Sequence, residues 1–263
     1  MKWRNLIMGL VAFGYAFLYI PVMLLVIYSF NESRLVTVWG GFSFKWYGEV
    51  LKNESLLNAA WLSLRIATVN ATFAVALGTL AAYSLNRYRR FRGRGGFELL
   101  LAAPLVMPDV IIGLSLLLLF VSLEQLIGWP PGRGFTTISI AHITFSLAYA
   151  AVVIRGRIGQ LDPLLEEAAM DLGAKPFTVF LRITLPLLAP ALISAWLLAF
   201  TLSLDDLVIA SFVSGPGSTT LPMWIYSSVR LGVKPEVNAL ATLMLLFVVI
   251  IVLFSGRIFN RKR

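Results

Sequence analysis

Residues 162–186 read DPLLEEAAMDLGAKPFTVFLRITLP and form a polar, charged stretch between long hydrophobic runs. Asp162 followed by Pro163 is typical of a helix start, because Asp caps free backbone N–H groups and Pro needs no donor at the first helical position. Gly173 predicts the end of this helix, because glycine tolerates the left-handed conformation best. The stretch therefore predicts a short capped helix outside the membrane.

The second half of the same stretch predicts another short helix. Pro176 opens it, and we expect it to end at Leu185 and Pro186, where the chain returns to the membrane. Glu166 and Glu167 lie early in the first helix, where negative charge suits the helix dipole. Two readings are open from these patterns alone: a docking element for a soluble partner, or an amphipathic segment that packs on its own bundle.

The composition predicts a membrane protein. Of the 263 residues, 59% are hydrophobic and 13% are charged, whereas soluble domains carry about 25% charged residues. There is no cysteine, which excludes a disulfide framework and a thiolate metal site. We interpret the net charge of +9 as basic residues flanking membrane helices, not as a nucleic-acid site.

Six apolar runs approach the length of about 20 residues that a spanning helix needs. They are residues 7–29, 57–85, 97–121, 137–154, 187–212 and 237–256. The first run is too long for the core of a signal peptide and lacks a small-residue cleavage site, so it is expected to remain as a span. We expect an all-α integral membrane protein in which one permease domain covers residues 1–263.

The distribution of basic residues predicts the orientation. Fifteen of the 22 Lys and Arg residues fall on the side of the two termini, of the loop at 87–94 and of the loop at 155–186. The positive-inside rule then places both termini and the loop 155–186 in the cytoplasm. Outside, we expect a short interfacial helix around Lys45 to Leu51. Ala74, Gly78 and Ala82 form a small-residue face that favours close helix packing.

Within residues 155–186, the sequence EEAAMDLGAKPFTVFLRITLP resembles the EAA motif of binding-protein-dependent ABC importer permeases. We call residues 155–186 the EAA loop. The resemblance implies a MetI-like fold and coupling helices that bind a cytoplasmic ATPase dimer. It matches the motif at Glu167, Ala168, Ala169, Gly173, Ile183, Leu185 and Pro186. With the flanking positions, the residues assigned to ATPase coupling are Glu166, Glu167, Ala168, Ala169, Gly173, Pro176, Leu185 and Pro186.

The chain has no G-x-x-x-x-G-K-[ST] phosphate loop. We therefore expect no ATPase site of its own, no cofactor and no catalytic residue, with ATP and Mg²⁺ bound by a partner subunit. An intramembrane enzyme is not supported either, because the sequence contains no H-E-x-x-H motif, no G-x-S-x-G motif and no Cys–His pair. In the family, a second, homologous permease completes the transport path.

Three carboxylates in the apolar runs are the candidate substrate pathway, because ionisable groups in a bilayer are costly without a function. Counted along a continuous helix from Phe97, Asp109 lies about 18 Å deep, near the midplane. Pro104, Pro108 and Gly113 are positions where that helix can break. Asp205 and Asp206 are adjacent in sequence.

Adjacent helical residues point about 100° apart. One of Asp205 and Asp206 is therefore expected to face the path, while the other caps a helix or pairs with a cation such as Arg65. Ser203, Thr201 and Ser211 are expected to bond locally. His142 is the single histidine, and packing or hydrogen bonding is the favoured role for it, with no metal site expected.

Carboxylates with nearby aromatic residues suit a cationic solute. PLVMPDVIIGLSLLLLF and FTLSLDDLVIASFVSGPGSTTLPMWIYSSVR also resemble the polyamine branch of these permeases, in particular the second permease subunit of putrescine importers. This resemblance implies a heterodimeric permease, a periplasmic polyamine-binding protein, the bacterial inner membrane and its lipid, and ATP-driven import by alternating access. Spermidine or another small cation stays open as cargo, and so does a stand-alone secondary transporter.

Overall fold

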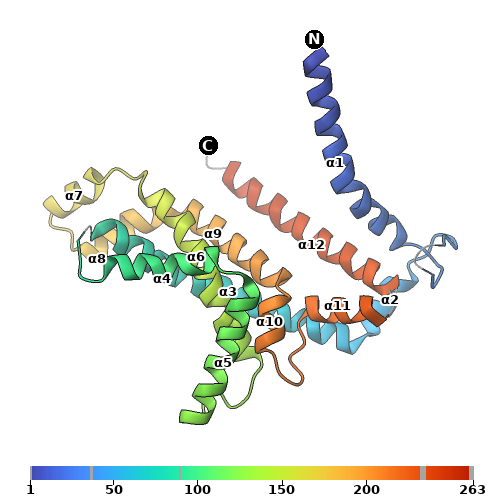
Figure 1. Ribbon diagram of the computed structural model, residues 1–263. Coiled ribbons are helices and arrows are strands. Elements are labelled where there is room, and N and C mark those ends of the chain that lie inside the picture. The colour runs from blue at the N-terminus through green and yellow to red at the C-terminus, as the bar shows by residue number, and fades with distance from the viewer. Residues whose placement is uncertain (1, 36–37, 89, 232–234, 261–263) are drawn as a thin grey trace. The chain divides into compact units, whose positions relative to one another are not determined.

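The computed structural model describes residues 2–35, 38–88, 90–231 and 235–260. Within these ranges the chain is almost entirely helical, with one isolated bridge between Asn31 and Phe42 in place of any strand. The all-α prediction is confirmed (Figure 1). Arg89 and the basic residues 261–263, which contributed to the predicted orientation, lie outside the described residues, as does Lys234.

The chain divides into two compact units, residues 1–58 with 224–263 and residues 59–223. The first unit holds α1 (Lys2–Tyr28), α2 (Lys45–Lys52) and α12 (Pro235–Asn260). The second holds most of α3 (Glu54–Arg87), α4 (Arg94–Val106), α5 (Asp109–Ile127), α6 (Phe135–Ile158), α7 (Leu164–Asp171), α8 (Pro176–Val179), the π-helical turn η1 (Phe180–Thr184), α9 (Leu185–Asp205) and α10 (Val208–Val213). Helix α11 (Leu221–Leu231) crosses the boundary between the units. The single domain expected from the sequence stays a prediction.

Five described helices are long and apolar enough to cross a membrane, and a sixth is shorter. The five are Leu6–Tyr28, Glu54–Arg87, Asp109–Ile127, Phe135–Ile158 and Pro176–Asp205, and the shorter one is Pro235–Ile250. Each corresponds to one of the six predicted runs, so the number of apolar segments agrees. The largest differences in boundaries are in the third run, 97–121, and in the fifth, 187–212.

The third predicted run, 97–121, is interrupted. Helix α4 ends at Val106, Met107 is extended, and α5 begins only at Asp109. Proline disfavours a helical conformation in the residue before it and has no N–H to donate, so Pro108 breaks the helix. Pro104 and Gly113, the other two expected break points, lie inside α4 and α5.

The second unit packs around α6, which contacts α4, α5, α9 and α10. Small residues allow this close approach. A Cβ atom on Gly78 of α3 would lie 3.1 Å from the Cβ atom of Ala150 and 3.1 Å from the backbone nitrogen of Ala151, and Ala74 and Ala82 are fully buried. The predicted small-residue packing face is confirmed. Such faces are typical of membrane helices, because in lipid the hydrophobic effect does not drive helices together and close packing must do so.

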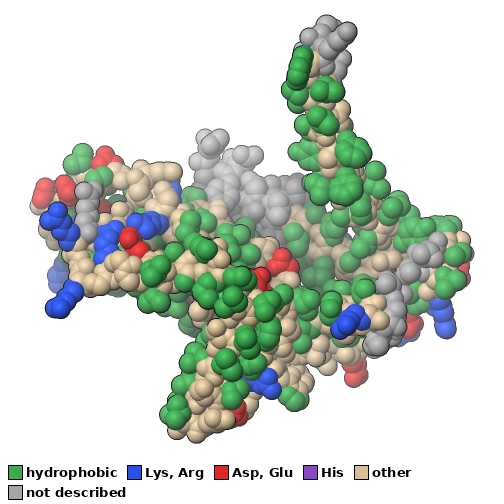
Figure 2. Space-filling view, in the orientation of Figure 1, with side chains coloured by type: hydrophobic (Ala, Val, Ile, Leu, Met, Phe, Trp, Pro, Cys, Tyr) green, Lys and Arg blue, Asp and Glu red, His purple; other side chains and the backbone are tan. Residues whose placement is uncertain are grey.

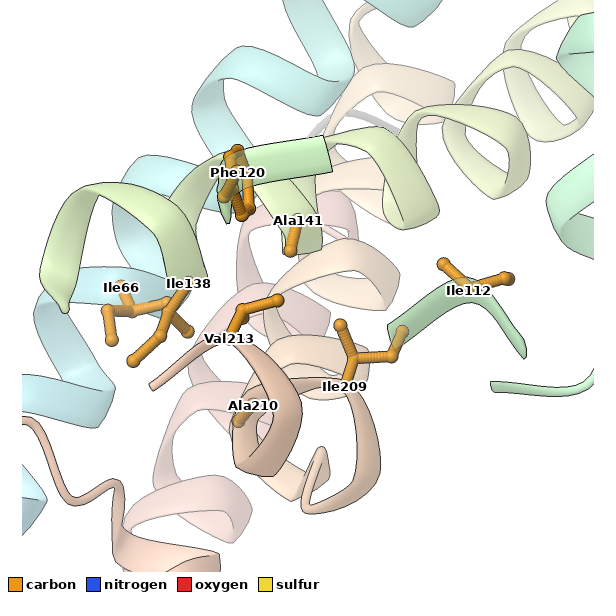
Figure 3. Packing of buried hydrophobic residues seen from close by; sticks show 8 residues of the cluster. All are labelled: Ile66, Ile112, Phe120, Ile138, Ala141, Ile209, Ala210 and Val213. Carbon is orange, nitrogen blue, oxygen red and sulfur yellow. The ribbon is translucent and has the colours of Figure 1, made fainter. Parts of the chain in front are cut away.

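One apolar cluster fixes the short helix α10. Figure 3 shows its eight buried residues, which come from α3, α5, α6 and α10: Ile66, Ile112, Phe120, Ile138, Ala141, Ile209, Ala210 and Val213. At the centre of the α5–α10 contact, a Cβ atom on Gly113 would lie 2.7 Å from Cδ2 of Phe212. Helix α10 therefore lies so close to α5 that a larger residue at position 113 would have to displace the Phe212 ring.

The first unit contains the predicted external helix as α2, Lys45–Lys52. Trp46 anchors it, because its indole nitrogen donates a buried hydrogen bond of 2.7 Å to the carbonyl oxygen of Asn31. At the end of α2, the amide of Asn53 donates to a carboxylate oxygen of Glu236 on α12 at 3.1 Å. These contacts join the segment around α2 to the last apolar helix, α12.

Candidate functional site

The EAA loop contains the first short helix expected from the sequence, as α7. A carboxylate oxygen of Asp162 accepts a hydrogen bond of 3.0 Å from the backbone N–H of Leu164, and Glu166 and Glu167 lie in the first turn of α7. The helix starts at Leu164, and Pro163 is its N-cap residue. The predicted start region and the Asp162 bond are confirmed, but Pro163 lies one residue before the first helical position where it was expected.

The end of α7 also follows the prediction. Gly173 has φ +85°, a conformation that costs other residues roughly 1–2 kcal/mol. The N–H of Gly173 donates to the carbonyl oxygen of Met170 at 2.9 Å, and that of Ala174 donates to the carbonyl oxygen of Ala169 at 3.1 Å. This pair of bonds is the Schellman arrangement that satisfies the last carbonyl groups of a helix.

The second helix of the loop differs from the expectation. It begins at Pro176 as predicted, but it does not end at Leu185 and Pro186. Instead the π-helical turn η1 joins α8 to α9, with the N–H of Leu185 donating to the carbonyl oxygen of Phe180, five residues earlier. Pro186 lacks an N–H, and its ring would clash with the carbonyl group four residues before it in a regular α-helix. The wider π turn accommodates that ring and keeps the helix continuous.

Glu166 holds the base of the loop. Its carboxylate accepts a hydrogen bond of 2.6 Å from Oγ1 of Thr184, and it lies 3.5 Å from Nη1 of Arg87 at the end of α3. These contacts border a cavity of about 410 Å³ that is also lined by Tyr83 and Ile158. Glu166 is therefore bonded within the chain, while the neighbouring Glu167 and Ala168 are exposed.

Two large apolar side chains of the loop, Leu172 and Phe177, are not covered by any other part of this chain. Leu172 is 91% exposed and Phe177 is 71% exposed, on either side of the turn at Gly173. Figure 2 shows Lys, Arg, Asp and Glu side chains gathered over α7 and α8, whereas the visible surface of α5 is mostly hydrophobic. Apolar side chains set among charges are typical of a protein-docking surface.

Asp109 lies at the break between α4 and α5. It is the first residue of α5 and is exposed, and negative charge at this position suits the helix dipole. The predicted depth of Asp109 assumed one continuous helix from Phe97, and the break at Met107 and Pro108 makes that count wrong. The carboxylate is presented at a helix end, not from the side of a helix.

Asp205 and Asp206 lie at a second break, between α9 and α10. Asp205 is the last residue of α9 and is exposed, whereas the side chain of Asp206 is only 10% exposed. Asp206 accepts hydrogen bonds from the backbone N–H groups of Ile209 at 3.3 Å and Ala210 at 2.8 Å. The expectation that one aspartate is a helix cap is confirmed, and the structure identifies it as Asp206.

The alternative role, pairing of that aspartate with Arg65, is not seen in the described part of the chain. The guanidinium group of Arg65 lies over the ring of Phe135, 4.9 Å from its centroid, and none of the ion pairs among the described residues joins it to an aspartate. The partner is His142 of α6, whose Nε2 lies 3.1 Å from Oδ2 of Asp206. The predicted hydrogen-bonding role of His142 is confirmed, but its carboxylate partner lies 64 positions away in sequence and left no local signal.

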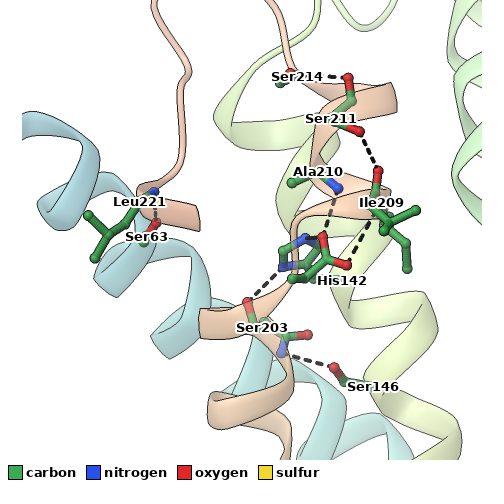
Figure 4. A network of polar contacts seen from close by, with 12 residues as sticks. Ser63, His142, Ser146, Ser203, Ile209, Ala210, Ser211, Ser214 and Leu221 are labelled. Carbon is green, nitrogen blue, oxygen red and sulfur yellow. Dashed lines mark hydrogen bonds and ion pairs between the residues drawn. The ribbon is translucent and has the colours of Figure 1, made fainter. Parts of the chain in front are cut away.

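Of the three hydroxyl groups near this break, two bond within their own helices as predicted and one bonds to another helix. Thr201 and Ser211 donate to carbonyl oxygens of their own helices, as expected. Ser203 does not bond locally, because its Oγ lies 2.7 Å from Nδ1 of His142 (Figure 4). A second buried link lies nearby, where the amide of Asn70 donates to Oγ of Ser146 at 3.1 Å.

Helix α10 packs on α5, so the two helix breaks lie at the starts of two helices that contact each other. Asp109 and Gly113 are four residues apart and so share one face of α5, and Gly113 is the position that contacts α10. Among the described residues, no group of three or more acidic or histidine side chains is arranged to hold a metal ion. The arrangement offers carboxylates at two helix ends.

Comparison with known families decides what kind of chain this is. Residues 74–263 match the model of the binding-protein-dependent transport system inner membrane component. The chain belongs to this family. It is therefore a multi-pass inner-membrane permease component with a MetI-like domain, and its apolar helices are membrane spans.

Two relatives of this permease are similar over most of its length. It is 63% identical to the putrescine transport system permease protein PotI of Escherichia coli strain K12, over 92% of this chain and 85% of that protein. It is 44% identical to the spermidine/putrescine transport system permease protein PotC of the same strain, over 94% of this chain and 91% of that protein.

Solved structures share the permease fold at low sequence identity. One is a bacterial ABC transporter involved in import of the acidic polysaccharide alginate, with a TM-score of 0.74, 20% identity, and coverage of 99% of this chain and 96% of that one. Another is the MetNI methionine ABC transporter in an inward-facing conformation, with a TM-score of 0.60, 16% identity, and coverage of 79% and 95%. At this identity the likeness establishes the fold alone.

Proposed function

We propose that this chain is one permease subunit of an ATP-driven ABC importer that carries a polyamine into the cell, and that this polyamine is putrescine. The observation that carries the proposal is the difference in similarity to two polyamine permeases: 63% identity to a putrescine permease against 44% to a spermidine/putrescine permease. The importer would pair this chain with a homologous permease, a cytoplasmic ATPase dimer and a periplasmic polyamine-binding protein.

The EAA loop supplies the proposed contact with the ATPase. Glu166 fixes the base of the loop to Arg87 and Thr184, so a force on the exposed face of α7 and α8 is passed to α3 and α9. Phe177 and Leu172 are not covered by the rest of this chain. They offer apolar anchors of the kind that dominate protein interfaces. ATP binding that draws two such loops together would then tilt the helices to which they are joined.

Asp109 and Asp205 are the proposed cargo-facing carboxylates. Both are exposed at helix breaks in membrane-spanning segments, where an unpaired charge is expensive unless it lines a path. A diamine carries one ammonium group at each end, and each group gains from a carboxylate when it leaves water. The permease performs no bond chemistry: it offers a cavity that opens first to one side and then to the other.

A reconstituted system tests the proposal. Proteoliposomes that contain this chain, its homologous permease and the ATPase, with the binding protein added outside, should take up labelled putrescine only when ATP is present on the ATPase side. Vesicles that contain this chain alone should take up none. Gradient-driven uptake by this chain alone would establish a secondary transporter, and preferential uptake of spermidine would replace putrescine as the cargo.

A further inference from the structure

His142 is buried at the point where three helices of the second unit meet. It is the single histidine of the sequence, its side chain is 3% exposed, and its helix α6 packs against both α9 and α10. Both ring nitrogens have partners, Nδ1 with Oγ of Ser203 at 2.7 Å and Nε2 with Oδ2 of Asp206 at 3.1 Å. The ring thus links α6 to the last turn of α9 and to the break that follows.

Both oxygens of the Asp206 carboxylate accept hydrogen bonds within the chain. Oδ1 accepts from the N–H of Ile209, and Oδ2 accepts from the N–H of Ala210 and from the imidazole. Because a carboxylate can only accept here, Nε2 of His142 is the donor of the bond between them. A cargo ammonium group that approached Asp206 would compete with three donors already bonded to a carboxylate that is only 10% exposed, whereas the adjacent Asp205 is exposed.

This network also fixes α10 in place. Asp206 has extended backbone angles, φ −67° and ψ 122°, so the chain turns here and α10 starts in a new direction. The side chain then bonds the first N–H groups of α10, while Phe212 of α10 packs on Gly113 of α5. The direction of α10, and with it the contact between α5 and α10, depends on where the Asp206 carboxylate is held.

We propose that His142 is a positioning residue of transport. It holds Asp206 as the cap of α10, so Asp206 is not a cargo ligand, and Asp205 is the member of the pair that is open to a cation. The inference rests on the proposed import function for its activity readouts, but the bond that it assigns can be measured without transport.

The first test is spectroscopic and uses the assembled complex in lipid. Because this chain has one histidine, the ¹⁵N-imidazole signal that disappears in a His142→Gln complex belongs to His142. We expect a proton on Nε2 that exchanges slowly with water and correlates with the Asp206 carboxylate. A rapidly exchanging Nε2 site in the wild-type complex would overturn the assignment whatever the cargo is.

The second test separates positioning from cargo contact by the amount of putrescine moved per ATP hydrolysed. His142→Leu removes the donor, and we expect ATP hydrolysis and uptake to fall together by about 10-fold, because a buried charged acceptor loses its partner. His142→Gln should keep most of both rates, because its amide nitrogen can reach the position of Nε2.

The two aspartates should then differ. Asp205→Asn should reduce putrescine uptake more than ATP hydrolysis, so that the ratio falls, whereas Asp206→Asn should lower both and leave the ratio unchanged. His142→Leu added to Asp206→Asn should produce little further loss, because the two residues act as a unit. A ratio that falls for Asp206→Asn as it does for Asp205→Asn would make Asp206 a cargo ligand and overturn the proposal.

Failure of the proposed function is distinguishable from failure of this inference. If the wild-type complex moves another cation instead of putrescine, the same ratios are measured with that cation. If the Leu variant does not assemble, the proton-exchange measurement on the wild-type complex decides, together with the two aspartate variants.

Discussion

The EAA loop and the α9–α10 break carry acidic residues in similar local patterns, yet they use them differently. In the loop, Glu166 is bonded to Arg87 and Thr184 while its neighbour Glu167 is exposed. At the break, Asp206 is bonded to His142 while its neighbour Asp205 is exposed. In each pair one carboxylate holds the fold, and the other is left free for a partner or a cargo.

The difference between the two regions lies in what sets the limits of their helices. The loop is bounded by local signals, the cap at Asp162 and the left-handed Gly173, and its apolar side chains are left uncovered. The break depends on a histidine from another helix and on a glycine contact with α5. Changes in the loop should therefore alter association with a partner, and changes at the break should alter the chain itself.

Phe177→Glu in the loop should give the largest effect. Phe177 is 71% exposed, so the substitution should leave the melting temperature of this chain unchanged. If Phe177 is an interface anchor, the ATPase should bind at least about 30-fold more weakly, since such anchors contribute about 2 kcal/mol or more. Titration of the ATPase into permease nanodiscs measures this.

Leu35→Glu is the matched control for that prediction. Leu35 is 63% exposed in the connection between α1 and α2, outside the EAA loop and outside the membrane-spanning helices. It should not change ATPase binding. Equal weakening by both substitutions would show that the loop has no special part in docking.

Gly113→Val, beside the α9–α10 break, should have the reverse effect to Phe177→Glu: it should change stability and not ATPase binding. A side chain at position 113 must displace Phe212, whose Cδ2 would lie 2.7 Å from the new Cβ atom, and overpacking of this kind costs about 1–3 kcal/mol. We expect a lower melting temperature and unchanged ATPase affinity. Gly95→Val in α4, where nothing lies within 4 Å, should leave the melting temperature close to that of the wild type.

Gly173→Ala should have a smaller and strictly local effect. The left-handed backbone at φ +85° costs a non-glycine residue about 1–2 kcal/mol, so the end of α7 should open more often. Hydrogen exchange at the amides of Gly173 and Ala174 should accelerate by about 5- to 30-fold. Gly156→Ala, in α6 with nothing within 4 Å, should leave those amides protected, and equal acceleration in both would refute the role of the left-handed turn.

Glu98→Gln should be the least disruptive change. Glu98 bridges Arg94 of α4 and Arg155 of α6 at 3.2 and 3.1 Å, but these side chains are partly exposed, and pairs of this kind contribute at most about 1 kcal/mol. We expect a shift of the melting temperature of no more than a few degrees, and the shift should vanish in high salt. A large, salt-independent loss of stability would show that this pair is protected from solvent.

The sequence alone predicted what depends on neighbouring residues. The limits of α7 followed from Asp162 and Gly173, and the helix interruption near Asp109 followed from the prolines around it. The continuity of α8 with α9 was missed, because Pro186 is usually a sign that a helix stops and only the π turn before it shows otherwise. The roles of Asp205 and Asp206 could not be separated, because that choice depends on His142, which only the fold brings near.

The π turn at Phe180–Thr184 has a mechanical consequence. Because it keeps Pro176 to Asp205 as a single 30-residue helix, the exposed ring of Phe177 and the cap at Asp206 belong to opposite ends of a rod about 45 Å long. A displacement at the Phe177 end is therefore transmitted to the Asp206 end along one helix, with no loop between them. The π turn at Phe180–Thr184 lies near the Phe177 end of this helix, so a small change in its winding would swing the Asp206 end sideways.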